Sequence, residues 1–133
     1  MVKVVFDTNV LVSAMLSNRG SSYKLVSLCA QGEFTGYTSG ALMLEFKQVI
    51  QRDFKVPIER AEQMVDVFLL FLKLVEPDVR LNVITDEADN RVLECALAVS
   101  ADYISSWDPH LTDLGEYQKT RILNPGKLLA IIA

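Results

Sequence analysis

Short runs of β-branched and other apolar residues alternate along the chain with longer stretches of helical periodicity. The first run, residues 2–6, is largely apolar, as expected for a strand that is buried on both faces of a sheet. Strands that are joined through helices generally pair in parallel, because the helix returns the chain across the sheet. The alternation therefore predicts an α/β fold, a three-layer sandwich with a central, mostly parallel sheet of four or five strands and helices on both faces.

Turn and capping residues divide the chain into the predicted elements. Strands are expected at residues 2–6, 34–38, 102–106 and 120–123, and residues 79–84 are either a loop or an edge strand. Helices are expected at residues 9–16, from a Ser21 or Ser22 cap to Gly32, from a Ser39 cap to residue 52, at 58–75, at 87–100 after an Asp86 cap, and after Asn124-Pro125-Gly126. Because the 133 residues contain no repeat and no linker, one domain spanning residues 1–133 is predicted.

Composition narrows the class of protein. Half of the residues are hydrophobic, which is enough for an ordinary core, and Cys29 and Cys95 lie outside any CxxC pattern, as in a reducing cytoplasm. No apolar run approaches the length of a membrane span, and Asp7 and Asn9 interrupt the apolar N-terminus, so a soluble, cytoplasmic protein without a membrane partner is expected. The net charge of −4 argues against binding nucleic acid through a broad basic surface, but it does not exclude an enzyme that contacts phosphate through cations.

Three acidic residues follow predicted strands: Asp7 directly, Glu45 in the helix after residues 34–38, and Asp108 shortly after residues 102–106. In open α/β sheets, ligands bind beyond the carboxyl ends of parallel strands. Glu45 also flanks the apolar stripe of its helix, and Asp89 occupies a core-like position on the apolar stripe of the next. A carboxylate on a buried face is costly unless it is paired or binds a metal ion, so these positions indicate a site.

Each acid also has an ordinary structural explanation. Asp7 and Asp108 could cap a helix or begin a turn, Glu45 could be a partly exposed edge residue, and Asp89 could complement the helix dipole. These explanations are four independent coincidences, whereas one acidic site at one sheet edge accounts for all four residues. Clustered carboxylates repel one another and prefer hard cations such as Mg²⁺ or Mn²⁺, which also bind phosphate oxygens. The hypothesis is therefore metal-assisted hydrolysis of a phosphodiester.

The acidic segments resemble, in order along the whole chain, those of the PIN-domain family. The matching segments are the strand ending in Asp7-Thr8-Asn9, Ser39 with Glu45, Asp86 to Ala96 around Asp89, Tyr103 to Leu111 around Asp108, and the closing strand with Pro125. The resemblance implies a central parallel sheet and Mg²⁺- or Mn²⁺-dependent RNA cleavage. It also implies a VapC-like toxin ribonuclease that is inhibited by a partner antitoxin.

Carried over to this chain, the resemblance makes Asp7, Glu45, Asp89 and Asp108 the catalytic, metal-binding acids. Thr8, Asn9, Ser39, Ser106 and Glu94 would support them. Glu94 lies about 140° around the helix from Asp89, so a supporting or structural role is expected, with a basic partner. Asp86 is predicted to be a helix cap, and it is also the best candidate for an additional ligand.

Two residues near the fourth acid depart from the family pattern. Trp107 stands where a small residue is expected; it could shape the pocket or stack on a base, although a lone tryptophan is more often part of a core or an interface. His110, the only histidine, is expected to be a surface or turn residue and not a general base. The RNA contacts themselves are not predicted, because the basic residues between positions 47 and 60 are interrupted by acids.

The competing interpretation is a catalytically inactive PIN scaffold that binds RNA or a protein partner. The presence of all four acids argues against loss of the site. The apolar residues of the predicted 58–75 helix exceed what one buried face needs, and we hypothesise that part of it buries a partner or a second copy of the chain in a homodimer.

Overall fold

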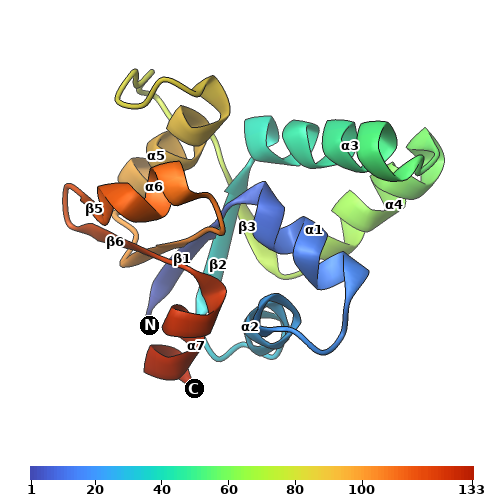
Figure 1. The fold of residues 1–133 in the computed structure, drawn as a ribbon, viewed down its shortest axis with the longest axis horizontal. Coiled ribbons are helices and arrows are strands. Elements are labelled where there is room, and N and C mark those ends of the chain that lie inside the picture. The colour runs from blue at the N-terminus through green and yellow to red at the C-terminus, as the bar shows by residue number, and fades with distance from the viewer.

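A six-stranded sheet runs through the middle of the molecule, with helices on both of its faces (Figure 1). The computed structural model describes residues 1–133. Its strands are β1 (Lys3–Phe6), β2 (Thr35–Ser39), β3 (Leu72–Val75), β4 (Tyr103–Ser105), β5 (Glu116–Tyr117) and β6 (Thr120–Leu123). Its helices are α1 (Thr8–Leu16), α2 (Ser21–Ala30), α3 (Gly40–Phe54), α4 (Ile58–Phe68), α5 (Glu87–Val99), α6 (Pro109–Leu114) and α7 (Pro125–Ile132).

The strand order is β3-β2-β1-β4-β6-β5, so the N-terminal strand lies near the centre of the sheet. All neighbouring strands are parallel except β5, which pairs with β6 in the antiparallel direction. The predicted α/β sandwich with a mostly parallel central sheet is confirmed. The sheet has six strands, two of which, β3 and the two-residue β5, the sequence patterns did not assign as strands.

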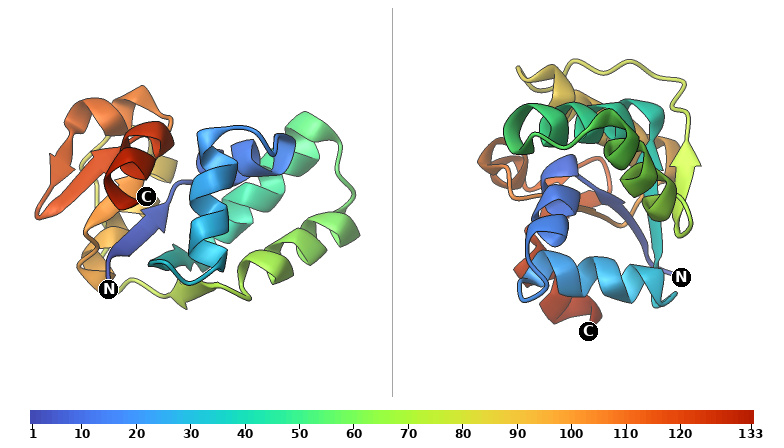
Figure 2. Two further views of the ribbon diagram at one scale, coloured as in Figure 1. Left: turned by 90° about the horizontal axis from the view of Figure 1, so that it is seen from below. Right: turned by 90° about the vertical axis from the view of Figure 1, so that its right-hand side faces the viewer.

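The two faces of the sheet have separate cores. Val4 and Phe6 of β1 point into a core shared with α1, α2, α3, α4 and α7, whereas Val5 points into a core built largely by α5 and α6. This alternation follows from the two-residue period of a strand. On the first face, α2 packs against both α1 and α7, as Figures 1 and 2 show.

Gly36 in β2 is packed too tightly for a side chain. A Cβ atom there would lie 2.6 Å from Cys29 Sγ and from Leu72 Cδ2, and 3.0 Å from the ring of Phe6. We expect Gly36→Ala to lower the free energy of unfolding by about 1–3 kcal/mol, because overpacking displaces core side chains. Urea denaturation measures this change, and Gly40→Ala, where a Cβ meets nothing within 4 Å, is the control. Equal stabilities of the two variants would contradict this packing.

The predicted 58–75 helix is wrong in its second half. Helix α4 ends at Phe68, where short-range backbone bonds from Leu70 and Phe71 tighten the chain into a turn. Residues 72–75 then form the edge strand β3, because the free edge of β2 offers them backbone hydrogen-bond partners. An uninterrupted apolar run has no periodicity that would distinguish these two structures.

Smaller differences concern caps and loops. Gly20, not Ser21 or Ser22, is the N-cap of α2, and residues 79–84 belong to an irregular segment. The predicted caps Ser39, Asp86 and Asn124 each accept a hydrogen bond from a backbone N–H of the helix that they begin. None of the helices combines the length and the apolar character needed to cross a membrane.

Candidate functional site

Three neighbouring parallel strands end side by side at one edge of the sheet. The register pairs Val5 with Tyr37 of β2 and Phe6 with Ser105 of β4, so the residues that follow in register are Asp7, Ser39 and Ser106. All three are buried. Helices α1 and α3 start from this edge, so it collects side chains from strand ends and from the first turns of helices (Figure 1).

Asp7 is held by a hydroxyl from the neighbouring strand end. Its side chain is only 4% exposed, and Ser106 Oγ donates a hydrogen bond of 2.6 Å to its Oδ2. The same Ser106 oxygen accepts from the backbone N–H of Asp108 at 2.9 Å and from Asn9 Nδ2 at 3.5 Å. Ser106 therefore donates its one hydroxyl proton to Asp7 and accepts hydrogen bonds from Asn9 and from the loop that carries Asp108.

Glu45 joins the edge from α3. Ser39 caps that helix by accepting from Leu42 N at 3.2 Å, which fixes where the helix starts. Thr8, buried in the first turn of α1, donates from Oγ1 to Glu45 Oε1 at 2.8 Å. Two helices that begin at adjacent strands are thus connected at the acidic side chain.

Asp89 and Asp108 complete the cluster from α5 and α6. Asp108 is the N-cap of α6 and accepts from the backbone N–H of His110 at 2.9 Å, whereas Asp89 lies in the first turn of α5 and is 4% exposed. Asp89 Oδ2 is buried and has no hydrogen-bond partner. A buried carboxylate oxygen without a partner is costly, so this atom points to a ligand.

The electrostatics of the site are those of crowded, buried carboxylates. Burial, reinforced by the charges of Glu45 and Asp108, raises the pKa of Asp7 to about 6 even though Ser106 lowers it. Burial and the adjacent Asp108 raise the pKa of Asp89 to about 8, and burial also raises the pKa of Glu45. No lysine or arginine forms an ion pair with any of the four acids. The cluster therefore attracts positive charge that the chain does not itself supply.

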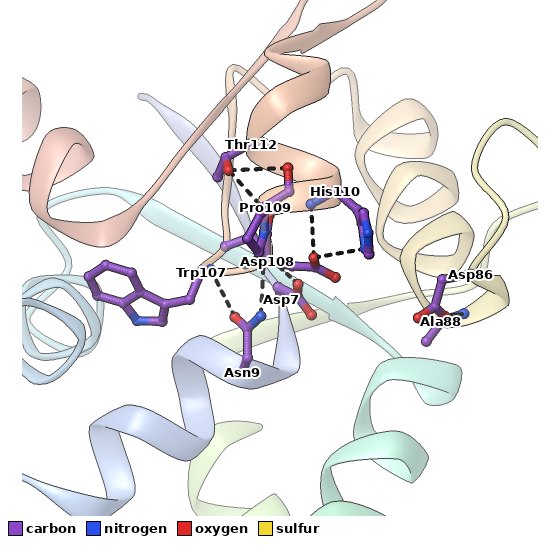
Figure 3. Close-up of polar contacts among 10 residues, drawn as sticks. Asp7, Asn9, Asp86, Ala88, Trp107, Asp108, Pro109, His110 and Thr112 are labelled. Atoms are coloured by element: carbon purple, nitrogen blue, oxygen red, sulfur yellow. Dashed lines mark hydrogen bonds and ion pairs between the residues drawn. The ribbon is translucent and has the colours of Figure 1, made fainter.

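The donor atoms are close enough for a cation to bridge them. One ligand atom each from Asp89, Asp108 and His110 lie within 4.8 Å of one another. Figure 3 shows Asp7 and Asp108 close together, with His110 beside Asp108. Carboxylate oxygens with one imidazole nitrogen suit divalent cations such as Mn²⁺, and the carboxylates alone suit Mg²⁺. The residues present fit a bound divalent metal ion.

Comparison with known proteins identifies the family. A family model described as a PIN domain matches residues 3–110, a range that includes all four acids. The chain belongs to the PIN-domain family. The resemblance that the acidic segments indicated is thereby confirmed.

Two further similarities place this PIN domain among known proteins. The Uncharacterized protein MJ1680 of Methanocaldococcus jannaschii is 28% identical over 127 residues, covering 92% of this chain and 81% of the relative. A chain in the crystal structure of VapBC2 from Rickettsia felis, bound to a DNA fragment from its promoter, matches with a TM-score of 0.66 at 17% identity. That match covers 92% of this chain and 98% of the other, and it shows a shared fold.

Two further acids that the sequence analysis singled out, Glu94 and Asp86, lie outside the cluster of four. Glu94 is buried, pairs with Arg91 at 2.8 Å and accepts from the backbone N–H of Leu81 at 2.7 Å, so it anchors the loop before α5. Asp86 is exposed and caps α5 by accepting from Ala88 N at 2.9 Å (Figure 3). Its charge nevertheless contributes to the raised pKa values of Glu45 and Asp89.

His110 is the residue whose position the sequence analysis did not anticipate. It is a surface residue, 78% exposed, as expected, but its Nδ1 lies 3.4 Å from Asp108 Oδ1. The cause is local, since Asp108 caps α6 and the first turn of that helix folds His110 back over its cap. The spacing Asp-x-His across a helix start, with proline at its first position, is the signal that could have indicated this proximity.

Proposed function

We propose that this PIN domain is a metal-dependent endoribonuclease, with Asp7, Glu45, Asp89 and Asp108 as its catalytic, metal-binding residues. The observation that carries the proposal is that four acids from separate elements lie at one edge of the sheet without a lysine or arginine ion-pair partner, and that Asp89 Oδ2 is buried there without a hydrogen-bond partner. A purely structural role does not account for a buried carboxylate oxygen such as Asp89 Oδ2 that has no hydrogen-bond partner. The phosphates of RNA and the carboxylates at this edge repel one another, so RNA can bind here only with cations between its phosphates and the acids.

The metal ion we propose is Mg²⁺ or Mn²⁺, held by carboxylates of the four acids, with His110 beside Asp108. When bound, such an ion lowers the pKa of water and stabilises negative charge that develops on a phosphate. The chain's own residues orient the acids: Ser106 holds Asp7, and Thr8 holds Glu45. Asn9 ties the start of α1 to the loop before Asp108. These contacts keep the carboxylates in one arrangement before substrate binds.

Incubation of total RNA with the purified protein tests the proposal. We expect cleavage with Mn²⁺ or Mg²⁺ and none with EDTA, because the crowded acids repel phosphate until cations bind. No cleavage under any metal, by folded protein shown to be free of a bound inhibitor, would favour the alternative of an inactive scaffold that binds RNA or a protein.

We further propose that the protein is the toxin of a toxin–antitoxin pair and acts in the cytoplasm, where RNA is available. The similar solved structure is that of VapBC2, and this chain exposes apolar side chains that an antitoxin could cover. Val67, Leu70 and Leu74, on α4, the following turn and β3, are 55%, 84% and 54% exposed. Burial of this surface in a homodimer is the other possibility.

The candidate antitoxin is the protein encoded by a reading frame next to the gene, and it is tested by producing it together with this chain. We expect the candidate antitoxin to co-purify with this chain and to inhibit RNA cleavage, and replacing Leu70 with aspartate to weaken the complex if the apolar surface is buried in it. Sedimentation of the chain alone distinguishes a homodimer from a monomer. If the chain alone is a monomer and the protein encoded by the neighbouring reading frame does not inhibit its cleavage of RNA, both proposed assemblies are contradicted.

A further inference from the structure

Trp107, the only tryptophan of the chain, lies between two residues of the acidic site. On one side is Ser106, which donates to Asp7, and on the other is Asp108. The backbone N–H of Trp107 donates to Asn9 Oδ1 at 3.1 Å, and the amide nitrogen of the same Asn9 donates to Ser106. The backbone that carries the indole ring is therefore tied to the contacts that orient the acids.

The ring itself is fixed from a different helix. Its Nε1–H donates to Ser22 Oγ of α2 at 2.8 Å, and Ser22 is 1% exposed. The indole N–H is the only polar group of the ring, and this hydrogen bond satisfies it without water. Figure 3 shows the ring on the opposite side of Asp108 from His110.

The hydrogen bond to Ser22 ties this loop to α2, but a structural role accounts for only part of the ring. Trp107 belongs to neither hydrophobic core, and its side chain is 43% exposed. A large aromatic surface held rigid in solvent gains little free energy from burial. The same surface gains from stacking on a flat ligand, and a ring fixed in advance loses little conformational entropy when it does so.

We propose that Trp107 stacks on a base of the RNA next to the phosphodiester bond that is cut, and so selects RNA with an unpaired nucleotide at that position. The inference rests on the proposed nuclease function. Trp107 directly precedes Asp108 and its backbone shares Asn9 with Ser106, so the proposal places the base next to the phosphate at the acids against this ring. The base must be unpaired and unstacked, since both of its faces are covered within a duplex. A protein partner could also use an exposed tryptophan, but the direct link to the acids favours the substrate.

The single tryptophan makes binding visible without any cleavage. We use the Asp7→Asn protein with Mg²⁺ so that the RNA is not consumed, and titrate it with a short single-stranded oligoadenylate. A matched oligomer with the same backbone but abasic sugars is the control ligand. Stacking predicts saturable quenching of the fluorescence of Trp107 by oligoadenylate, and tighter binding of that oligomer than of the abasic one.

Kinetics of the active protein give an independent measurement. We expect Trp107→Ala to raise KM for single-stranded RNA about 5- to 150-fold, with a smaller effect on kcat. Trp107→Phe keeps an aromatic face and should retain most of the affinity, whereas Ser22→Ala, which frees the ring, should fall between them. Tyr23→Ala is the matched control, because Tyr23 is equally exposed but lines an apolar cavity with Met64 and Phe68. Circular dichroism confirms that each variant is folded.

The outcomes separate this proposal from the nuclease function. Base-dependent quenching without cleavage by the unmodified protein would support stacking and contradict the nuclease. Cleavage with an unchanged KM in folded Trp107→Ala, or equal quenching by the abasic oligomer, would overturn stacking and leave the nuclease intact. Quenching by a protein partner, with none by RNA, would also overturn it and assign the ring to a protein interface.

Discussion

Asp7→Asn is expected to reduce metal-dependent RNA cleavage on the order of 1000-fold, equivalent to about 4 kcal/mol of lost transition-state stabilisation. The substitution keeps the shape of the side chain, and the amide oxygen can still accept the hydrogen bond from Ser106. It removes only the charge that would bind the metal ion. The measurement is the initial rate of cleavage of a labelled RNA with Mn²⁺.

The stability of the same variant separates a catalytic role from a structural one. Burial places the pKa of Asp7 at about 6 in the folded protein, against 3.8 for the ordinary side chain. Above pH 6 the ionised residue therefore costs the metal-free protein about 3 kcal/mol, and Asp7→Asn should be at least as stable as the unmodified protein at pH 7.

Asp113→Asn is the matched control for the activity, because Asp113 is an exposed acid of α6 outside the cluster. It should cleave RNA at the unmodified rate. If Asp7→Asn retained full activity, either the cleavage would come from a contaminant or Asp7 would lie outside the reaction. If it unfolded at neutral pH, the carboxylate would be structural.

The sequence predicts the acidic edge well because local signals determine it. The apolar run of β1 leads directly to Asp7, and the caps Ser39 and Asp86 set the starts of α3 and α5. Once those starts and the parallel pairing are known, the helical period determines which way Glu45 and Asp89 face. The raised pKa of Asp89 is then the physical result of placing an acid on a buried stripe.

Other features depend on contacts between distant parts of the chain. The edge strand β3 exists because β2 has a free edge, and the run from Phe68 to Val75 has no period that reveals this. The pairs Thr8 with Glu45 and Ser22 with Trp107 join residues 37 and 85 positions apart. Hydroxyl groups at such separations leave no pattern in a single sequence, so these supporting contacts become visible only in the folded chain.

The metal-free protein is expected to lose thermal stability as the pH rises from about 5 to about 8. Asp7 and Asp89 have pKa values of about 6 and about 8 in the folded chain, both above the ordinary value of 3.8. Groups with raised pKa values hold protons in the folded state that the unfolded state releases. Their contribution is therefore fully present below about pH 4 and is lost as the pH passes each folded value. Asp7 alone loses about 1.4 kcal/mol between pH 5 and its folded pKa of about 6, so it contributes a fall in melting temperature on the order of 5 °C over this range.

A divalent cation should reverse this trend, because it binds the ionised carboxylates of the folded protein and not the dispersed acids of the unfolded chain. Calorimetry with EDTA, Mg²⁺ or Mn²⁺ at pH 5 and pH 8 measures the effect, and the increase in melting temperature should be larger at pH 8. Asp89→Asn should flatten the pH dependence of the metal-free protein and weaken the response to metal. Asp113→Asn should leave both unchanged. Equal shifts by metal at the two pH values, or an unaltered response in Asp89→Asn, would show that the cation binds away from the four acids.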